Sequence, residues 1–300
     1  QRDIASSVQN IFEKQLIKIC KKINILNFSK NLVYAGGCAL NSLANKKIFE
    51  SNLFEKIYIP YAPGDAGGSI GSALKVIKSK NKNALLKNLY SPYIGPIYNN
   101  NDIKSELNNN FKLKEFNIKK YENTDELNVE VAKKIFENKI VGYFNNKMEF
   151  GARALGNRSI LANPCNPNIK EIINLKIKRR ESFRPFAPAI IYEEKYKWFN
   201  NSLSNPYMSN VENIIENQRN KIPAVTHIDG TGRVQTVTKD INIDFYNLIS
   251  EFYKLSNVPI LLNTSFNENE PIVMSYKNAI ECFIRTKMDI LVLNTFVIER

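Results

Sequence analysis

Short apolar runs alternate with segments of helical spacing along this chain, and the alternation limits the folds that it can adopt. Apolar residues at helical spacing from Ile4 to Ile23 predict an amphipathic helix over 4–25. A strand is expected at 31–35, followed by a glycine turn and a helix over 39–49. Because strands and helices continue to alternate, we expect an α/β or α+β fold.

The same patterns predict the other elements and one boundary. Strands are expected at 56–59, 139–144, 187–191, 260–262, 290–293 and 296–298, and helices at 69–78, 124–138, 166–175, 244–255 and 278–286. Thr124 is the expected N-cap of its helix. Residues 81–110 are rich in Asn, Lys, Tyr and Pro without sustained periodicity, which predicts a linker. We therefore expect two domains, 1–92 and 93–300.

The charge balance narrows the classes of partner. The 42 Lys and Arg residues against 29 Asp and Glu give a net charge of +13, which suggests anionic partners, either nucleic acid or small phosphates. Nucleic acid is the less favoured of the two, because no nucleic-acid fold motif is visible. We expect no membrane partner, because no apolar run approaches the ~20 residues that a membrane span needs.

Cysteine and histidine usage restricts the redox and metal chemistry. The four cysteines lie far apart without paired spacing, at Cys20, Cys38, Cys165 and Cys282. This spacing argues against a zinc knuckle and a disulfide scaffold, and it favours free thiols in a reducing cytoplasm. His227 is the only histidine, so the chain itself cannot form a His-rich metal site. Asp229 could orient His227 as a general base, although we favour a structural role for this histidine.

The most distinctive segment runs from Lys147 to Leu161 and carries Arg153 and Arg158 among glycines, with no acid between the two arginines. Arginine presents a planar fork of donors that fits carboxylates and phosphates. Glycines let the backbone approach a ligand closely. The segment is therefore predicted to be a loop that holds an oxyanion. In the alternative interpretation, its arginines pair with distant acids or lie in water.

Further cations and polar groups are candidates for the same site. Lys178, Arg184 and Arg233 are expected to contribute positive charge, Arg184 because Pro185 fixes the backbone after it. For the neighbouring Lys176, Arg179 and Arg180, a solvated helix end is the favoured interpretation.

Asn263, Ser265 and Asn267 follow or end an apolar strand, where α/β folds commonly place ligand groups. Their amide and hydroxyl groups could bind a polar substrate. The alternative is a turn held together by Asn and Ser hydrogen bonds.

Six stretches, in the same order along the chain, resemble the NodU/CmcH-type O-carbamoyltransferases. They are 36–41, 64–68, 147–161, 180–188, 233–237 and 262–267. One backbone-shaping position departs from the family, because Ala152 stands where proline is usual.

The resemblance implies a fold and an activity. Residues 1–92 would be the carboxyl-terminal part of an ASKHA-like (actin-type) lobe, and 93–300 a YrdC-like domain. That domain would join carbamoyl phosphate and ATP into carbamoyl adenylate, with Arg153, Arg158, Arg184 and Arg233 as catalytic cations. Lys178, Asn263, Ser265 and Asn267 would bind the substrate. The complete protein would transfer the carbamoyl group to a hydroxyl of a sugar or natural product.

The resemblance also implies nucleotide and metal contacts in the first part. The nucleotide-binding candidates are Gly36, Gly37, Asn41, Gly67 and Gly68. Asp65 would ligate a divalent metal, Mg or Fe. In the family the other metal ligands come from a preceding part of the protein, and this chain has no segment that could supply them.

Two other functions stay open at this point. The net charge and the relation of the family to tRNA-modifying YrdC proteins allow a non-catalytic nucleotide- or RNA-binding module. The chain could also be a subunit that completes its lobe with a separate partner chain. A homodimer is a further option.

Overall fold

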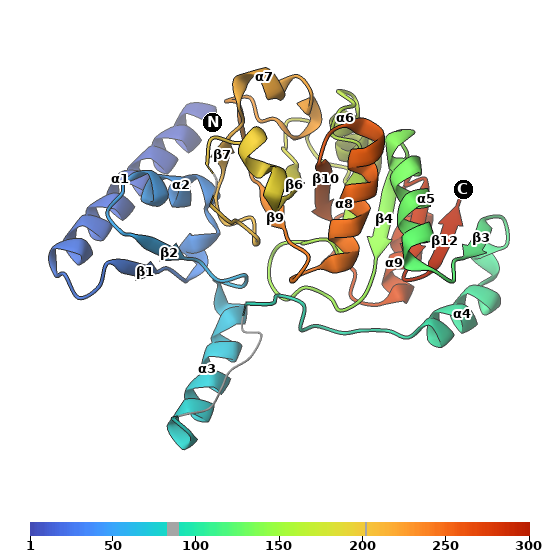
Figure 1. The fold of residues 1–300 in the computed structure, drawn as a ribbon, viewed down its shortest axis with the longest axis horizontal. Helices are drawn as coiled ribbons and strands as arrows, with labels where there is room; N and C mark the ends of the chain where they lie inside the picture. Colours follow the sequence, from blue (N-terminus) through green and yellow to red (C-terminus); the bar gives the residue numbers. More distant parts are fainter. Residues whose placement is uncertain (83–89, 202) are drawn as a thin grey trace.

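The computed structural model describes residues 1–82, 90–201 and 203–300. Those residues form a small amino-terminal α/β unit beside a larger domain built on one mixed, 8-stranded sheet (Figure 1). The predicted mixed α/β class is confirmed. The ASKHA-like and YrdC-like assignments and the boundary between residues 92 and 93 stay predictions.

In the amino-terminal unit, two helices pack against a pair of parallel strands. Helices α1 (Arg2–Ile25) and α2 (Ser42–Glu50) contact each other beside strands β1 (Asn31–Val33) and β2 (Lys56–Tyr58). Their common core consists of Leu16, Cys20, Ala44, Ile48 and Phe54. The helix expected over 4–25 and both expected strands are therefore confirmed.

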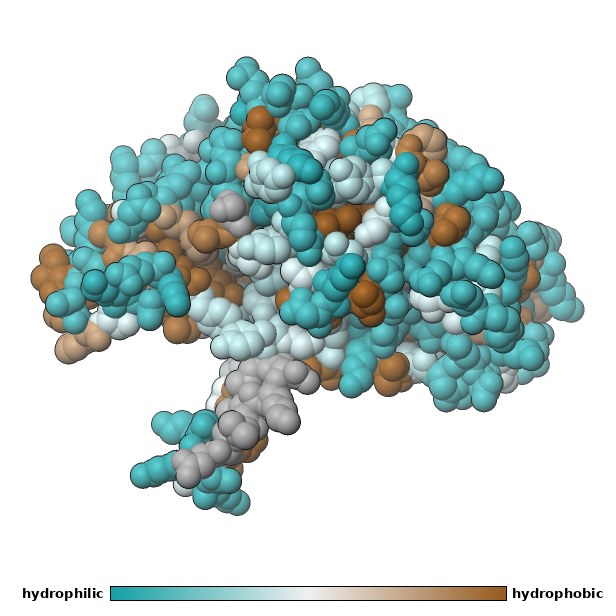
Figure 2. Space-filling model, in the orientation of Figure 1, coloured by the Kyte–Doolittle hydropathy of each residue, from teal (hydrophilic) through white to brown (hydrophobic). Residues whose placement is uncertain are grey.

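The apolar face of α1 is only partly covered. Leu16 and Cys20 are buried, but Ile4, Val8 and Ile11 are each at least 60% exposed. Hydrophobic side chains accordingly gather over the amino-terminal unit in Figure 2. The spacing thus predicted the helix correctly, while the structure leaves a large part of its apolar face at the surface.

Two helices of this unit begin at different residues from those expected. The segment 39–49 divides into a 3₁₀ turn, η1 (Gly37–Leu40), and α2, because the Asn41 side chain caps α2 by accepting the Ala44 N–H. Helix α3 (Asp65–Lys80) starts before the expected residue 69. It projects from the body of the protein, and none of its 16 described residues is buried (Figure 1).

The large sheet mixes parallel and antiparallel pairs. Its strands lie in the order β3 (Asn117–Lys120), β12 (Phe296–Glu299), β11 (Ile290–Leu293), β4 (Val141–Phe144), β5 (Arg158–Ala162), β10 (Ile260–Ser265), β6 (Ala187–Ile191) and β9 (Gln235–Val237). The pairs β4–β11 and β6–β9 are parallel, and the other neighbours are antiparallel. All five strands that were expected here are confirmed, two of them with the predicted bounds.

Strand β5 lies where the sequence predicts a loop. It occupies the middle of the sheet between β4 and β10, and all five of its residues are buried. A short strand that is buried on both faces shows no alternation of apolar and polar residues. The charged Arg158 at its start made a buried strand even harder to predict.

Helices α5 (Thr124–Phe136) and α8 (Ile243–Ser256) lie side by side against the sheet (Figure 1). Helix α9 (Tyr276–Arg285) packs against β11 and β4. The three corresponding predictions are confirmed, but Asn123 rather than Thr124 is the N-cap of α5, because its side chain accepts the Asp125 backbone N–H at 2.8 Å. None of the described helices is both long and apolar enough to cross a membrane.

Shorter elements connect these layers. They are α4 (Asn100–Asn109), η2 (Phe111–Leu113), α6 (Ile169–Ile172), the π-helical turn η3 (Ile173–Ile177), η4 (Tyr192–Lys197), β7 (Glu212–Asn213), α7 (Glu216–Arg219), η5 (Pro223–Val225) and β8 (Thr231–Gly232). The prediction of a linker over 81–110 was wrong for α4, whose Ile103 and Leu107 are buried in the core. Residues 83–89 of that predicted linker lie outside the described residues.

The two parts of the protein meet in one small apolar cluster. Tyr61 and Ala62 of the amino-terminal unit pack with Leu155, Tyr207 and other side chains of the larger domain. The buried Asn45 of α2 also donates to the backbone carbonyl of Ser209, at 2.6 Å. This contact region borders the end of the sheet where the candidate site lies.

Candidate functional site

One end of the large sheet collects most of the polar segments that the sequence singled out. Strand β10 ends there with Ser265 opposite Ser159 of β5, and β6 starts there with Ala187 opposite Asn263. Strand β9, parallel to β6, begins at the same end. The loops that precede β5, β6 and β9 and the loop that follows β10 therefore lie together, although they are far apart in sequence.

Lys178 joins the segment after η3 to the segment after β10. Its Nζ donates to Asn267 Oδ1 at 2.6 Å, to the Asn267 carbonyl at 2.9 Å and to Ser265 Oγ at 3.2 Å, and it also contacts the Ser265 carbonyl. The side chain is 1% exposed. Burial, with a smaller contribution from the charge of Arg180, lowers the pKa of Lys178 to about 7. Three of the predicted site residues thus form one contact group.

An open cavity of about 770 Å³ lies against this group. Its lining includes Lys178, Arg180, Arg184, Ser265, Asn267 and Asn269. Arg179, Glu181 and Glu268 also line it, so positive side chains outnumber carboxylates and the cavity is suited to an anionic ligand rather than an apolar one.

Arg180 belongs to the site, although the sequence favoured a solvated helix end for it. Its Nε donates to Oδ1 of the buried Asn174 at 2.7 Å, and its guanidinium lies 5.1 Å from the ring centre of Phe186. Burial and then the charge of Arg184 lower the pKa of Arg180. These contacts fix its position, which corrects the expectation. The available signal was its place at the start of the 180–188 stretch.

Arg233 is the most strongly perturbed of the arginines. Burial, followed by the charges of Arg153 and Arg180, lowers its pKa to about 9. Its buried Nε has no hydrogen-bond partner in the described part of the chain. Among residues 1–82, 90–201 and 203–300, Arg153, Arg180 and Arg233 form no salt bridge. Together with Lys178 and Arg184 they make up what we call the cationic cluster.

Arg184 lies at the exposed rim of the cavity. Its Nε is 2.8 Å from Glu181 Oε2, and both side chains are about half exposed. Such a pair is largely screened by water, so the guanidinium can exchange this partner for a ligand at little cost. The predicted ligand role of Arg184 stays a prediction.

Arg153 points from its loop toward the amino-terminal unit. It is partly buried, and its Nη2 donates to the backbone carbonyl of Leu40 at 3.1 Å. Burial lowers the pKa of Arg153. Its charge thus lies at the contact between the two parts of the protein, near enough to Arg233 to perturb it.

Arg158 differs from the other arginines because it is completely buried. Its Nη1 donates to the carbonyls of Asn145 and Asn157, both at 2.8 Å, and its Nη2 to those of Pro96 and Asn146. Burial lowers its pKa to about 10. We assign Arg158 a structural role, which corrects the expectation that it holds an anion.

Asn263 contacts the loop that carries Arg153, both directly and through Gln235. Its Nδ2 donates to Gln235 Oε1 at 2.7 Å and to the Ala154 carbonyl at 3.3 Å, and Gln235 Nε2 in turn donates to the Leu155 carbonyl. Asn263 is buried and does not line the cavity described above. In this structure it therefore shapes the site through the loop, whereas Ser265 and Asn267 face the cavity.

The predicted nucleotide contacts divide into two kinds. Asn41 caps α2, and a Cβ on Gly67 would meet the Ala62 carbonyl at 2.0 Å, so packing explains both residues. Around Gly36, Gly37 and Gly68, by contrast, a Cβ would meet no atom of the described residues within 4 Å. Of the five predicted contacts, these three glycines leave room for a ligand, and their nucleotide role stays a prediction.

Asp65 does not assemble a metal site with the residues described. It is exposed in the first turn of α3. Within the described ranges, no group of three or more His, Cys, Asp and Glu side chains could hold a metal ion. The residues present do not fit the implied metal, and we derive no chemical step through it.

His227 stabilises a turn. Its Nδ1 is 3.1 Å from Thr231 Oγ1, while Asp229 Oδ1 accepts both the N–H and the hydroxyl of Thr231. Burial lowers the pKa of His227. Asp229 therefore bonds to the threonine and not to the histidine, in agreement with the favoured structural role.

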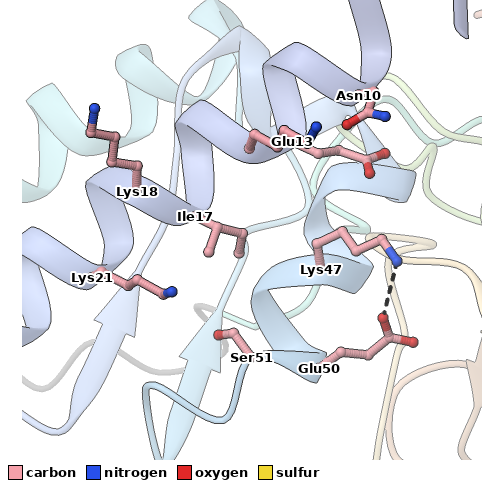
Figure 3. A pocket seen from close by; sticks show the side chains of 9 residues that line it. Asn10, Glu13, Ile17, Lys18, Lys21, Lys47, Glu50 and Ser51 are labelled. Atoms are coloured by element: carbon pink, nitrogen blue, oxygen red, sulfur yellow. Dashed lines mark ion pairs between the residues drawn. The ribbon is translucent and has the colours of Figure 1, made fainter. Parts of the chain in front are cut away.

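A second hollow, of about 580 Å³, lies between α1 and α2 (Figure 3). Lysines and glutamates line it, including Lys18, Lys21 and the ion-paired Lys47 and Glu50. It belongs to the amino-terminal unit and contains none of the predicted site residues. We therefore place the candidate site at the cationic cluster.

Known proteins resemble the chain over its whole length. Residues 132–300 match the family model described as carbamoyltransferase C-terminus, and residues 1–74 match carbamoyltransferase N-terminus. An uncharacterized protein of Synechocystis, sll1178, is 36% identical over 100% of this chain and 52% of its own length. Nodulation protein NolNO of Sinorhizobium fredii is 36% identical over 100% of this chain and 44% of its own.

The chain spans about half the length of these curated relatives. Among solved structures, full-length HypF aligns with a TM-score of 0.40 and 18% identity, over 59% of this chain and 22% of that chain.

Proposed function

The chain belongs to the carbamoyltransferase family, and we propose that its cationic cluster binds carbamoyl phosphate together with the phosphates of ATP. In this proposal, residues 93–300 convert the two substrates into a carbamoyl adenylate in two steps. Water cleaves carbamoyl phosphate to carbamate and orthophosphate, and a carbamate oxygen then attacks the α-phosphate of ATP and displaces pyrophosphate. The complete protein then transfers the carbamoyl group to a hydroxyl of a sugar or natural product.

The observation that carries the proposal is the group of like charges at the sheet end. Arg233 is partly buried with its Nε fully enclosed, lacks a salt bridge within the described residues and is perturbed by two other arginines. Buried cations without a counter-charge raise the free energy of the fold. An anion in their midst would offset that repulsion, so the arrangement favours a phosphate-bearing ligand.

The cluster offers two kinds of contact to such a ligand. Arg180 presents a guanidinium group at the cavity wall, and Arg233, which does not line the cavity, adds a second guanidinium group behind it. Guanidinium groups bind phosphate oxygens in bidentate fashion. Lys178 presents an ammonium group next to the Ser265 hydroxyl and the Asn267 amide, at the wall of the cavity. Preorganised donors of this kind stabilise charge that develops during group transfer.

Arg153 extends the cluster toward the amino-terminal unit. The carbonyl to which it donates belongs to Leu40, in the η1 turn that follows Gly36. Open space around Gly36 and Gly37 supports a nucleotide contact on that side. The ATP would then lie between the two parts, with its phosphates toward the cluster.

Calorimetric titration with carbamoyl phosphate tests the binding step. We expect Arg180→Gln to weaken binding at least about tenfold, since charge-assisted hydrogen bonds typically contribute ~1.5–3 kcal/mol each. Arg2→Gln, at the exposed start of α1, is the matched control and should bind like the parent protein. Equal affinities in all three proteins would remove the cluster from the proposal.

A further inference from the structure

Glu149 is a buried carboxylate whose hydrogen bonds all go to one loop. It is 2% exposed and immediately precedes residues 150–157, the loop that carries Arg153. Its Oε1 accepts the backbone N–H groups of Leu155, Asn157 and Arg158, the last two at 3.2 Å. Three backbone donors on one oxygen fix the return of this loop into β5.

Other side chains hold the carbonyl groups of the same loop. Tyr93 Oη and Gln235 Nε2 each donate to the Leu155 carbonyl at 2.8 Å. Asn263 Nδ2 donates to the Ala154 carbonyl. The peptide group between Ala154 and Leu155 is therefore held from both sides, with Asn263 on its carbonyl and Glu149 on its N–H. The N–H of the next peptide group, that of Gly156, donates to Ser159 Oγ at 3.0 Å.

The loop also passes between closely packed neighbours. Gly151 has a φ of +127°, and a Cβ there would lie 2.5 Å from the Tyr61 carbonyl. Gly156 has a φ of +113° and lies against the Phe245 ring. Only glycine fits at these two positions without strain. The loop that Glu149 binds therefore has little conformational freedom.

We propose that Glu149 is a positioning residue, which aims the Arg153 guanidinium at the anion by clamping the backbone of residues 155–158. The inference rests on the proposed function, because it takes the anion site as given. It adds that a carboxylate, itself unsuited to contact with an anion, is required for anion binding. Nothing in its own contacts lets Glu149 reach the ligand, so its effect must pass through the loop.

A double-mutant cycle with carbamoyl phosphate as the probe tests this inference. Glu149→Ala should weaken binding about tenfold, the loss expected when backbone hydrogen bonds to a charged group disappear. The same change in an Arg153→Ala protein should have no further effect, because the residue that Glu149 positions is already absent. Amide hydrogen exchange of residues 150–158 should accelerate in both Glu149→Ala proteins.

Glu149→Gln covers the case in which the alanine variant does not fold. Glutamine keeps an acceptor oxygen for the three N–H groups, so its effect on affinity should be smaller and should again vanish beside Arg153→Ala. Equal losses with and without Arg153 would overturn the inference while leaving the proposed function intact. If instead the parent protein and Arg180→Gln bind carbamoyl phosphate alike, the proposed function itself fails.

Discussion

Lys178 Nζ lies 2.6 Å from Asn267 Oδ1, and this contact joins two segments that are 89 positions apart in the sequence. The ammonium group is buried, yet it faces oxygen acceptors rather than a carboxylate. This explains why its pKa falls to about 7. The contact also brings the lysine to the wall of the cavity, where its charge is available to a ligand.

The pKa of Lys178 predicts a pH-dependent affinity for anions. Below about pH 7 the amine carries its proton, and above that value it loses the proton, so binding should weaken as pH rises. Sulfate is a suitable probe between about pH 6 and about pH 8, because its own charge is constant there and Arg233, whose pKa is lowered to about 9, stays largely protonated. The affinity should fall across this interval in the parent protein and should be flat in Lys178→Gln. A parallel decline in both proteins would refute the assignment.

The same shift also has a consequence for stability. The folded pKa of about 7 lies below the ordinary value of 10.5, so the unfolded chain binds more protons between these two values. The contribution of this lysine to the free energy of unfolding therefore rises with pH over that interval. In urea unfolding, the free energy of unfolding of the parent protein should therefore rise with pH relative to that of Lys178→Gln.

Arg233 is predicted to favour binding at the expense of stability. Arg233→Gln removes a partly buried charge that two other arginines repel, so the free energy of unfolding should stay equal or rise by about 1 kcal/mol. Its affinity for carbamoyl phosphate should nevertheless fall at least about tenfold. Urea unfolding and calorimetry on the same preparation measure both effects. A variant that is less stable and binds normally would show that Arg233 is structural.

Arg158 is predicted to behave in the opposite way. Arg158→Ala removes the donor of the Asn145 carbonyl and one of the two donors of the Asn157 carbonyl, and it takes the neighbouring charge from Glu149. We expect a loss of about 3–5 kcal/mol in the free energy of unfolding, as for other buried charges that lose their partner. Arg2→Ala should change it little. A stable Arg158→Ala protein that fails to bind the anion would restore the role expected from the sequence.

Two glycines in the predicted motifs should respond in opposite directions to alanine. Gly156 has a φ of +113°, and a Cβ there would lie 2.3 Å from the Phe245 ring, so Gly156→Ala should cost at least about 2 kcal/mol. Gly68 lies exposed within α3 with open space around it, so Gly68→Ala should stabilise by about 0.5–1 kcal/mol. Thermal unfolding of both variants checks the pair, and destabilisation by Gly68→Ala would contradict our description of α3.

The elements with clear periodicity could be predicted from the sequence, and those without it could not. Helix α1 and strands β6 and β11 follow from their apolar spacing. Strand β5 could not be predicted, because a strand that is buried on both faces does not alternate between apolar and polar residues. Helix α4 escapes because its Asn-rich sequence has only two apolar residues, Ile103 and Leu107, to mark the buried face.

The candidate site was only partly predictable, because side-chain roles depend on distant contacts. The sequence named Lys178, Ser265 and Asn267, but only the antiparallel course of β10 brings them together. It could not separate Arg158 from Arg153, since the carbonyls that occupy Arg158 come from other parts of the chain. Arg180 was undervalued because its fixed position depends on a buried asparagine that only the folded chain supplies.

The most direct test of the account is the release of pyrophosphate from ATP in the presence and absence of carbamoyl phosphate. Formation of an adenylate from ATP releases pyrophosphate, so release by the parent protein should depend on carbamoyl phosphate. It should fall at least about tenfold in Arg180→Gln and stay unchanged in Arg2→Gln. Release that is independent of carbamoyl phosphate, or equal in the parent and Arg180→Gln proteins, would contradict the central claim.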